Sequence, residues 1–149
     1  KSGSSLGDCK AKKLASNHAV DSKFVDAVVF GGSHKLSEFK LDKTRRPVQT
    51  LKAVIKDKAD CALIDDSEKN ELSHIDGGSS LKVLWSSAEL PPMAVVAFSS
   101  APSADRAKFK AALDSLCTGE DKKTCEKLGI VLLKSGDDSP YAAVIEAYD

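Results

Sequence analysis

Short apolar stretches alternate with amphipathic ones over the first 66 residues, and this alternation constrains the fold more than any other feature of the chain. Strands are expected at 12–16 (KKLAS), 38–42 (EFKLD) and 59–66 (ADCALIDD). Two helical patterns separate them: Asp21 caps the first, and Pro47 stands at the first helical position of the second. The strand–helix–strand–helix–strand order predicts an α/β fold, a three-layer lobe with a mostly parallel sheet followed by C-terminal helices.

The rest of the chain reads differently. Further strands are expected at 81–87, 93–99 and 130–134, with helices at 66–73, 103–116, 121–128 and 141–149. These patterns divide the chain into a flexible leader at 1–9, an α/β lobe at 10–90 and a C-terminal part at 91–149.

The charge balance excludes one class of partner. Lys plus Arg and Asp plus Glu both total 22, so the formal net charge is zero, without the basic surplus of a nucleic-acid-binding protein. No apolar stretch has the length of a membrane span. Because the first residue is Lys1 rather than Met, we expect a processed chain, and a removed secretory signal fits this expectation.

The four cysteines do not form the C-x-x-C pairs of structural zinc or thioredoxin-like sites. We expect Cys117 and Cys125 to form a disulfide, because the polar segment between them could bring two helix ends together. An exported, oxidising setting would follow. Cys9 and Cys61 each lie at the start of a predicted strand, so they either form a second disulfide or are two small buried thiols.

No metal, cofactor or catalytic centre is expected. The three histidines, His18, His34 and His74, lack the spacing of metal ligands. Ser33 and His34 follow two glycines, but the G-x-S-x-G sequence of a nucleophile elbow does not occur there. An enzyme that uses His34 or a free cysteine is a minor alternative.

Polar residues follow each of the three predicted strands at its carboxyl end. In open α/β sheets, ligands bind outside these ends. Two of the ends also begin helices, whose free N–H groups and dipole favour an anion. The candidate ligand-binding residues are Ser16, Asn17, His18, Thr44, Arg45, Arg46, Asp65 and Asp66.

Each candidate also has a simpler interpretation. Ser16 and Asn17 could only satisfy the turn into a helix, and the two arginines could lie in solvent. Asp65 and Asp66 could hold an amine, order a water or bind a cation, and at least one of them is expected to cap the helix at 66–73.

Several longer stretches resemble one protein family. The opening strand AKKLAS, the helix end IKDKADCA and the segment LKVLWSSAELPPMAVV follow one another as in type 2 periplasmic solute-binding proteins. The closest branch resembles the phosphate and phosphonate receptors of ABC importers. The C-terminal segments ALDSLCTGEDKKTCEKLGI and DDSPYAAVIEAY are similar to the closing helices and the usual ending of these receptors.

The resemblance implies two α/β lobes that close on a small anionic ligand, an ABC permease as partner and a periplasmic or otherwise exported location. It makes 10–90 the ligand-binding lobe and 91–149 the returning strand and C-terminal helices of the partner lobe. The first half of that partner lobe has no counterpart in the chain, so we expect self-association or a separate segment to cover the exposed strand edges. The alternative is an interaction or sensing module that keeps the fold without a transport role.

Overall fold

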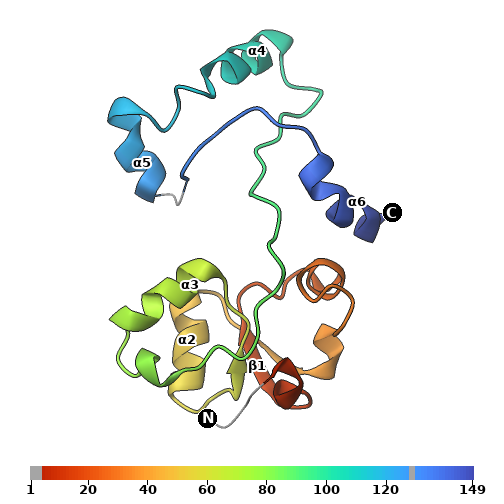
Figure 1. Ribbon diagram of the computed structural model, residues 1–149, viewed down its shortest axis with the longest axis vertical. Coiled ribbons are helices and arrows are strands. Elements are labelled where there is room, and N and C mark those ends of the chain that lie inside the picture. Colours follow the sequence, from red (N-terminus) through yellow and green to blue (C-terminus); the bar gives the residue numbers. More distant parts are fainter. Residues whose placement is uncertain (1–4, 128–129) are drawn as a thin grey trace. The chain divides into compact units, whose positions relative to one another are not determined.

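The structure is a computed structural model that describes residues 5–127 and 130–149 (Figure 1). The strands and α-helices are β1 (Lys13–Ser16), α1 (Ser22–Phe24), β2 (Lys40–Lys43), α2 (Pro47–Ile55), β3 (Cys61–Ala62), α3 (Asp66–Glu71), α4 (Ser103–Ala112), α5 (Lys122–Lys127) and α6 (Ala142–Tyr148). A π-helical turn at Val25–Val29 continues α1, and 3₁₀ turns lie at Leu6–Cys9, Leu36–Glu38, Leu72–His74, Gly78–Ser80, Gly119–Asp121 and Ser139–Tyr141. In these ranges no helix is long and apolar enough to cross a bilayer.

The chain divides into two units, which are described separately. The first runs to Leu90 and includes Ala143–Asp149, and the second is Pro91–Ala142.

A three-stranded parallel sheet in the order β2-β1-β3 organises the first unit. Leu14 of the central strand pairs with Leu41 on one side and Cys61 on the other. Leu14 and Ala15 are almost completely buried, at 2% and 0% exposure, because apolar residues cover both faces of the central strand. The predicted α/β fold with a parallel sheet is confirmed.

The two faces of the sheet carry separate apolar clusters. Leu14 belongs to a cluster with Val25 and Phe30, against which Trp85 packs. Ala15 points to the other face, where Val54 of α2 covers it. Figure 1 shows α2 beside β1 in this lobe. The sheet thus forms the middle of three layers, and its carboxyl-end edge lies between them.

Helix α2 begins at Pro47, as the sequence predicted. Proline fits the first helical position because its missing N–H would have no partner inside the helix. The preceding residue, Arg46, is extended, and the helix ends just before Asp57, which has a positive φ of 56°. The chain thereby turns directly from the helix into β3, which places the end of β3 beside that of β1.

Three strand predictions are wrong. The segments at 81–87, 93–99 and 130–134 adopt no regular secondary structure. A strand needs a neighbour that satisfies its N–H and C=O groups, and within the described residues these segments pair with none. Residues 84 and 85 still pack against the core of the first unit, so the apolar pattern marks burial there without marking a strand.

The second unit contains α4 and α5, and its described residues form no apolar core of their own. Of its described residues only Cys117 is buried. Several large apolar side chains are instead exposed, among them Met93 at 86%, Phe98 at 74% and Val131 at 94%. A unit with so little burial gains little stability from its own packing.

One disulfide lies in each unit. Cys9 and Cys61 join the segment before β1 to β3, with their Cα atoms 6.2 Å apart, and Cys9 is part of the core around Leu14. Cys117 and Cys125 join the ends of a short loop, with Cα atoms 5.4 Å apart. Both separations lie in the range that disulfides adopt.

Candidate functional site

Ser16 ties the ends of all three strands together. Its side chain is only 1% exposed, and its hydroxyl donates to the Leu63 carbonyl after β3 at 3.0 Å. The same oxygen accepts the N–H of His18 at 3.0 Å. Its main-chain carbonyl accepts the N–H of Thr44, after β2, also at 3.0 Å. The polar residues that follow β1, β2 and β3 therefore meet where the three strands reach their carboxyl ends, and this region is named the strand-end edge.

A chain of hydroxyl groups fixes the orientation of Asn17. The buried Thr50 of α2 donates its hydroxyl hydrogen to Asn17 Oδ1 at 2.8 Å. The hydroxyls of Thr44 and Thr50 lie 2.5 Å apart, and since Thr50 has only one hydrogen, Thr44 donates in this contact. With its oxygen held by Thr50, Asn17 turns its Nδ2 group to the strand-end edge, where Nδ2 lies 3.2 Å from His18 Nε2.

A buried carboxylate lies beneath this edge. Glu68 of α3 is 1% exposed, and its Oε2 lies 2.7 Å from His18 Nε2. Because a carboxylate only accepts, Nε2 carries the hydrogen in this contact. Nε2 also lies 3.5 Å from Asp65 Oδ2. The side chain of His18 thus reaches across the sheet edge from β1 to two acids near the start of α3.

Asp65 and Glu68 form a capping box at the start of α3. Asp65 Oδ1 accepts the N–H of Glu68 at 2.8 Å, and Glu68 Oε2 accepts the N–H of Asp65 at 3.0 Å. Partial burial raises the pKa of the Asp65 carboxyl, but the hydrogen bonds from Glu68 and Ser67 and the nearby His18 outweigh it and hold this pKa below its ordinary value. The other oxygen of Glu68, Oε1, is buried and has no hydrogen-bond partner among the described residues.

The remaining candidates are exposed. The Arg45 N–H donates to Gln49 Oε1 at 3.2 Å, Arg46 precedes α2, and Asp66 is the first residue of α3. No ion pair involves these three side chains in the part of the chain that the structure describes. The structure brings together Ser16, Asn17, His18, Thr44 and Asp65, and leaves Arg45, Arg46 and Asp66 in solvent near the same strand ends.

Thr50 and Glu68 were not among the residues selected from the sequence. The D-x-x-E spacing of Asp65 and Glu68 is the signature of a capping box and could have identified Glu68 as a cap. Thr50 is a polar residue beside the buried Leu51 and therefore on the covered side of α2. No local pattern indicates that either residue contacts the end of β1.

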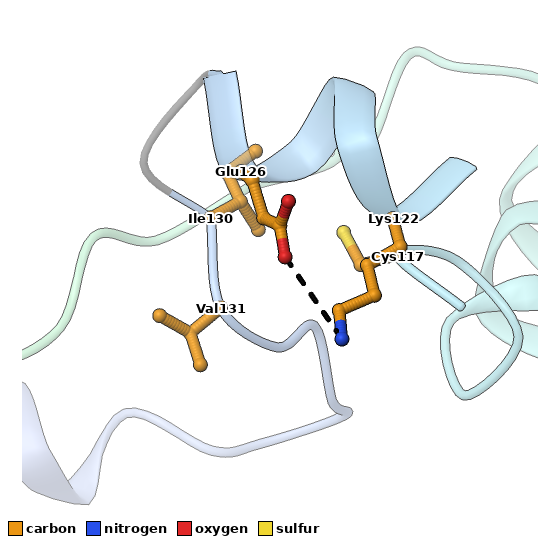
Figure 2. A pocket seen from close by; sticks show the side chains of 5 residues that line it. All are labelled: Cys117, Lys122, Glu126, Ile130 and Val131. Carbon is orange, nitrogen blue, oxygen red and sulfur yellow. Dashed lines mark ion pairs between the residues drawn. The ribbon is translucent and has the colours of Figure 1, made fainter. Parts of the chain in front are cut away.

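The second unit contains a pocket of about 310 Å³, shown in Figure 2. It is lined by Cys117, Lys122, Glu126, Ile130 and Val131. Lys122 and Glu126 form an ion pair at 3.9 Å, and both side chains are more than half exposed. Their charges cancel and none of the strand-end residues lines this pocket, so the edge of the sheet is the better candidate site.

Comparison with known proteins agrees with this fold. A family model described as "ABC transporter, phosphonate, periplasmic substrate-binding protein" matches residues 5–141. A comparison with curated proteins finds no match. The family match extends over nearly the whole chain and includes every residue of the strand-end edge. The chain therefore belongs to the family of periplasmic substrate-binding proteins of phosphonate ABC transporters.

Proposed function

We propose that this protein is an exported receptor that binds a small oxyanion, phosphate or phosphonate, and delivers it to an ABC permease without catalysing a reaction. The observation that carries the proposal is the meeting of three polar strand ends at one sheet edge, in a chain that belongs to a solute-binding family. Such an edge is where open α/β sheets bind ligands.

The proposed ligand contacts follow from the hydrogen-bond pattern. Thr50 holds the oxygen of the Asn17 amide, and since Nδ2 carries two hydrogens, one would remain for the ligand beside the contact of Nδ2 with His18 Nε2 at 3.2 Å.

In the first turn of α2, Pro47 has no N–H and the N–H groups of Gln49 and Thr50 donate to the Arg46 carbonyl, so the Val48 N–H and the helix dipole would favour an anion. Arg45 and Arg46 stand just before the helix and would neutralise the charge of the anion.

The other candidates have different roles in the proposal. Thr44 gives its hydroxyl hydrogen to Thr50 and its N–H to Ser16, and His18 gives its N–H to Ser16 and its Nε2 hydrogen to Glu68, so both would act by shaping the edge around the ligand. Asp65 and Asp66 would hold a positive or hydrogen-bond-donating group of the ligand. Ser16 has its hydroxyl hydrogen on Leu63 and would act by holding the edge in shape.

We propose residues 10–90 as the ligand-binding lobe and 91–149 as part of a partner lobe. High affinity would then require closure of two lobes over the ligand. The exposed apolar side chains of 93–98 support this view, because they need cover from a further segment or from a second copy of the chain.

The test is thermal unfolding of the chain in the presence of phosphate, a phosphonate or sulfate, on material whose mass is determined by light scattering. A ligand that binds only the folded state adds about 2.7 kcal/mol of stability at a hundred times its dissociation constant. A rise in the unfolding midpoint with phosphate or phosphonate is expected. No rise with any oxyanion, for a monomer or an oligomer, would refute the proposal.

Paired variants locate the site. Arg45→Ala removes a cation at the proposed site, and a lost charge-assisted hydrogen bond of about 1.5–3 kcal/mol weakens oxyanion binding roughly tenfold to a hundredfold. Lys52→Ala removes the same charge from an exposed position further along α2 and serves as the control. Equal effects of the two substitutions would indicate a general charge effect rather than a site.

A second candidate function is an interaction or sensing module with the same fold. The observation that favours it is the absence of an apolar core among the described residues of 91–142. Self-association that is tight and independent of oxyanions, seen by light scattering, would favour this module over a transport receptor.

A further inference from the structure

Only one oxygen of the buried Glu68 carboxylate accepts hydrogen bonds from the described residues. Its Oε2 accepts two hydrogen bonds, from His18 Nε2 at 2.7 Å and from the Asp65 N–H at 3.0 Å. Its Oε1 accepts none from the described residues, although the side chain is 1% exposed. An unsatisfied oxygen on a buried carboxylate is costly, and such a group is ordinarily paired with a cation or bound to a metal.

The surrounding atoms have the spacing of metal ligands. One ligand atom each from His18, Asp65 and Glu68 can be chosen so that all three lie within 4.8 Å of one another. His18 Nε2 lies 2.7 Å from Glu68 Oε2 and 3.5 Å from Asp65 Oδ2. Ligands held about 2.0–2.2 Å from one Zn²⁺ in a tetrahedron are roughly 3.4 Å apart. Small side-chain movements would therefore suffice to bring the three around one ion.

The charges favour a cation at the same place. Asp65 and Glu68 supply two carboxylates, and in the described chain no arginine or lysine forms an ion pair with either of them; the basic group beside them is the His18 imidazole. An oxyanion at this edge would meet these carboxylates unless a positive group lay between them. A divalent cation would cancel their charge.

We propose that His18, Asp65 and Glu68 form a binding site for a divalent cation of the Zn²⁺ class, with a coordination position open to an oxygen of the bound oxyanion. Imidazole favours Zn²⁺ over Mg²⁺ and Ca²⁺, which prefer oxygen ligands alone. To bind the ion, His18 offers the lone pair of Nε2, with its ring hydrogen on Nδ1. The site stands on its own geometry, and its contact with the oxyanion rests on the proposed function.

The first test uses the metal alone. The full chain is freed of metal with a chelator, and Zn²⁺ is titrated in competition with a chromophoric chelator, with Mg²⁺ titrated separately. One saturable equivalent of Zn²⁺ is expected, with no comparable binding of Mg²⁺. Absence of a saturable Zn²⁺ equivalent, or equal binding of Mg²⁺, would overturn the proposal.

A matched pair of variants distinguishes this site from general histidine binding. His18→Gln and Glu68→Gln each remove one ligand, and since even outer-shell changes cost roughly tenfold in metal affinity, a loss of at least about tenfold is expected. His34→Gln is the control, because His34 Nδ1 lies 2.9 Å from Glu38 Oε2 and forms a histidine–carboxylate pair outside the cluster. Circular dichroism checks that the variants fold, and His18→Gln keeps the test valid if the buried Glu68→Gln variant unfolds. Equal losses in the His18 and His34 variants would overturn the assignment.

The link to the oxyanion is tested separately, by titrating phosphate and a phosphonate with Zn²⁺ and with a chelator. Tighter binding with Zn²⁺ supports an ion that bridges protein and ligand. Equal binding in both conditions overturns the bridge and leaves the proposed function intact. Binding of Zn²⁺ without any binding of oxyanion upholds the metal site and contradicts the proposed function.

Discussion

Breaking the Cys9–Cys61 disulfide is expected to destabilise the first unit far more than breaking Cys117–Cys125 destabilises its own surroundings. A crosslink limits the freedom of the unfolded chain, and the effect grows with the length of the loop that it closes. The sequence separations are 52 and 8. The chain-entropy relation then gives about 4 kcal/mol for the longer loop and about 2.6 kcal/mol for the shorter one at 25 °C.

The assay is urea unfolding followed by fluorescence of Trp85, the single tryptophan, which packs against Phe30 in the core of the first unit. The oxidised and reduced wild-type chain are compared with the Cys9→Ala/Cys61→Ala double variant, in which both thiols are removed. Cys117→Ala/Cys125→Ala is the control, since its disulfide lies in the other unit and should leave the Trp85 transition unchanged. A loss below about 1 kcal/mol on reduction would refute the loop-entropy reasoning. Four free thiols by mass spectrometry under oxidising conditions would refute the pairing itself.

Two further substitutions test contacts in the first unit. Thr50→Val removes the buried hydroxyl that donates to Asn17 Oδ1 and keeps the shape of the side chain. We expect the free energy of unfolding, measured in urea, to fall by about 1–3 kcal/mol. An unchanged free energy of unfolding would contradict the chain of hydroxyl groups. The hydrogen bond from the Tyr148 hydroxyl is the main reason that the pKa of Asp21 lies below its ordinary 3.8. The contact therefore stabilises the fold at pH values above 3.8, and this stabilisation is lost as the pH falls through the lowered pKa of Asp21. Tyr148→Phe should therefore raise the pKa of Asp21 in an NMR titration of its carboxyl, and an unchanged pKa would show that α6 does not make this contact in solution.

The parts of the fold that depend on local chemistry were predictable. Asp21 accepts the N–H of Phe24 at the start of α1, and Pro47 begins α2, because caps and first-turn prolines act within a few residues. The parallel sheet followed from the alternation of strands and helices, which leaves few other ways to bury both faces of a strand such as β1.

Individual side-chain contacts within the site, between residues far apart in the sequence, were not predictable. His18 and Glu68 are fifty positions apart, and neither has a local pattern that indicates the other. The residues at 93–99 have the composition of a strand, but composition supplies no neighbour to complete the hydrogen bonds. Strand propensity measures how well a residue suits a position in a sheet, and whether a neighbouring strand is present depends on the rest of the fold.

The hydrogen bonds of Ser16 limit how this edge can change during evolution. One side chain holds the ends of β1 and β3 together and also shapes the turn that carries His18, so a substitution there alters the scaffold and the binding surface at once. Adaptation to a new ligand is easier at Arg45, Arg46 and Asp66, because their side chains are exposed and do not hold the strands together. Related chains with different ligands should therefore diverge at these exposed positions while they keep a small hydroxyl residue at the position of Ser16.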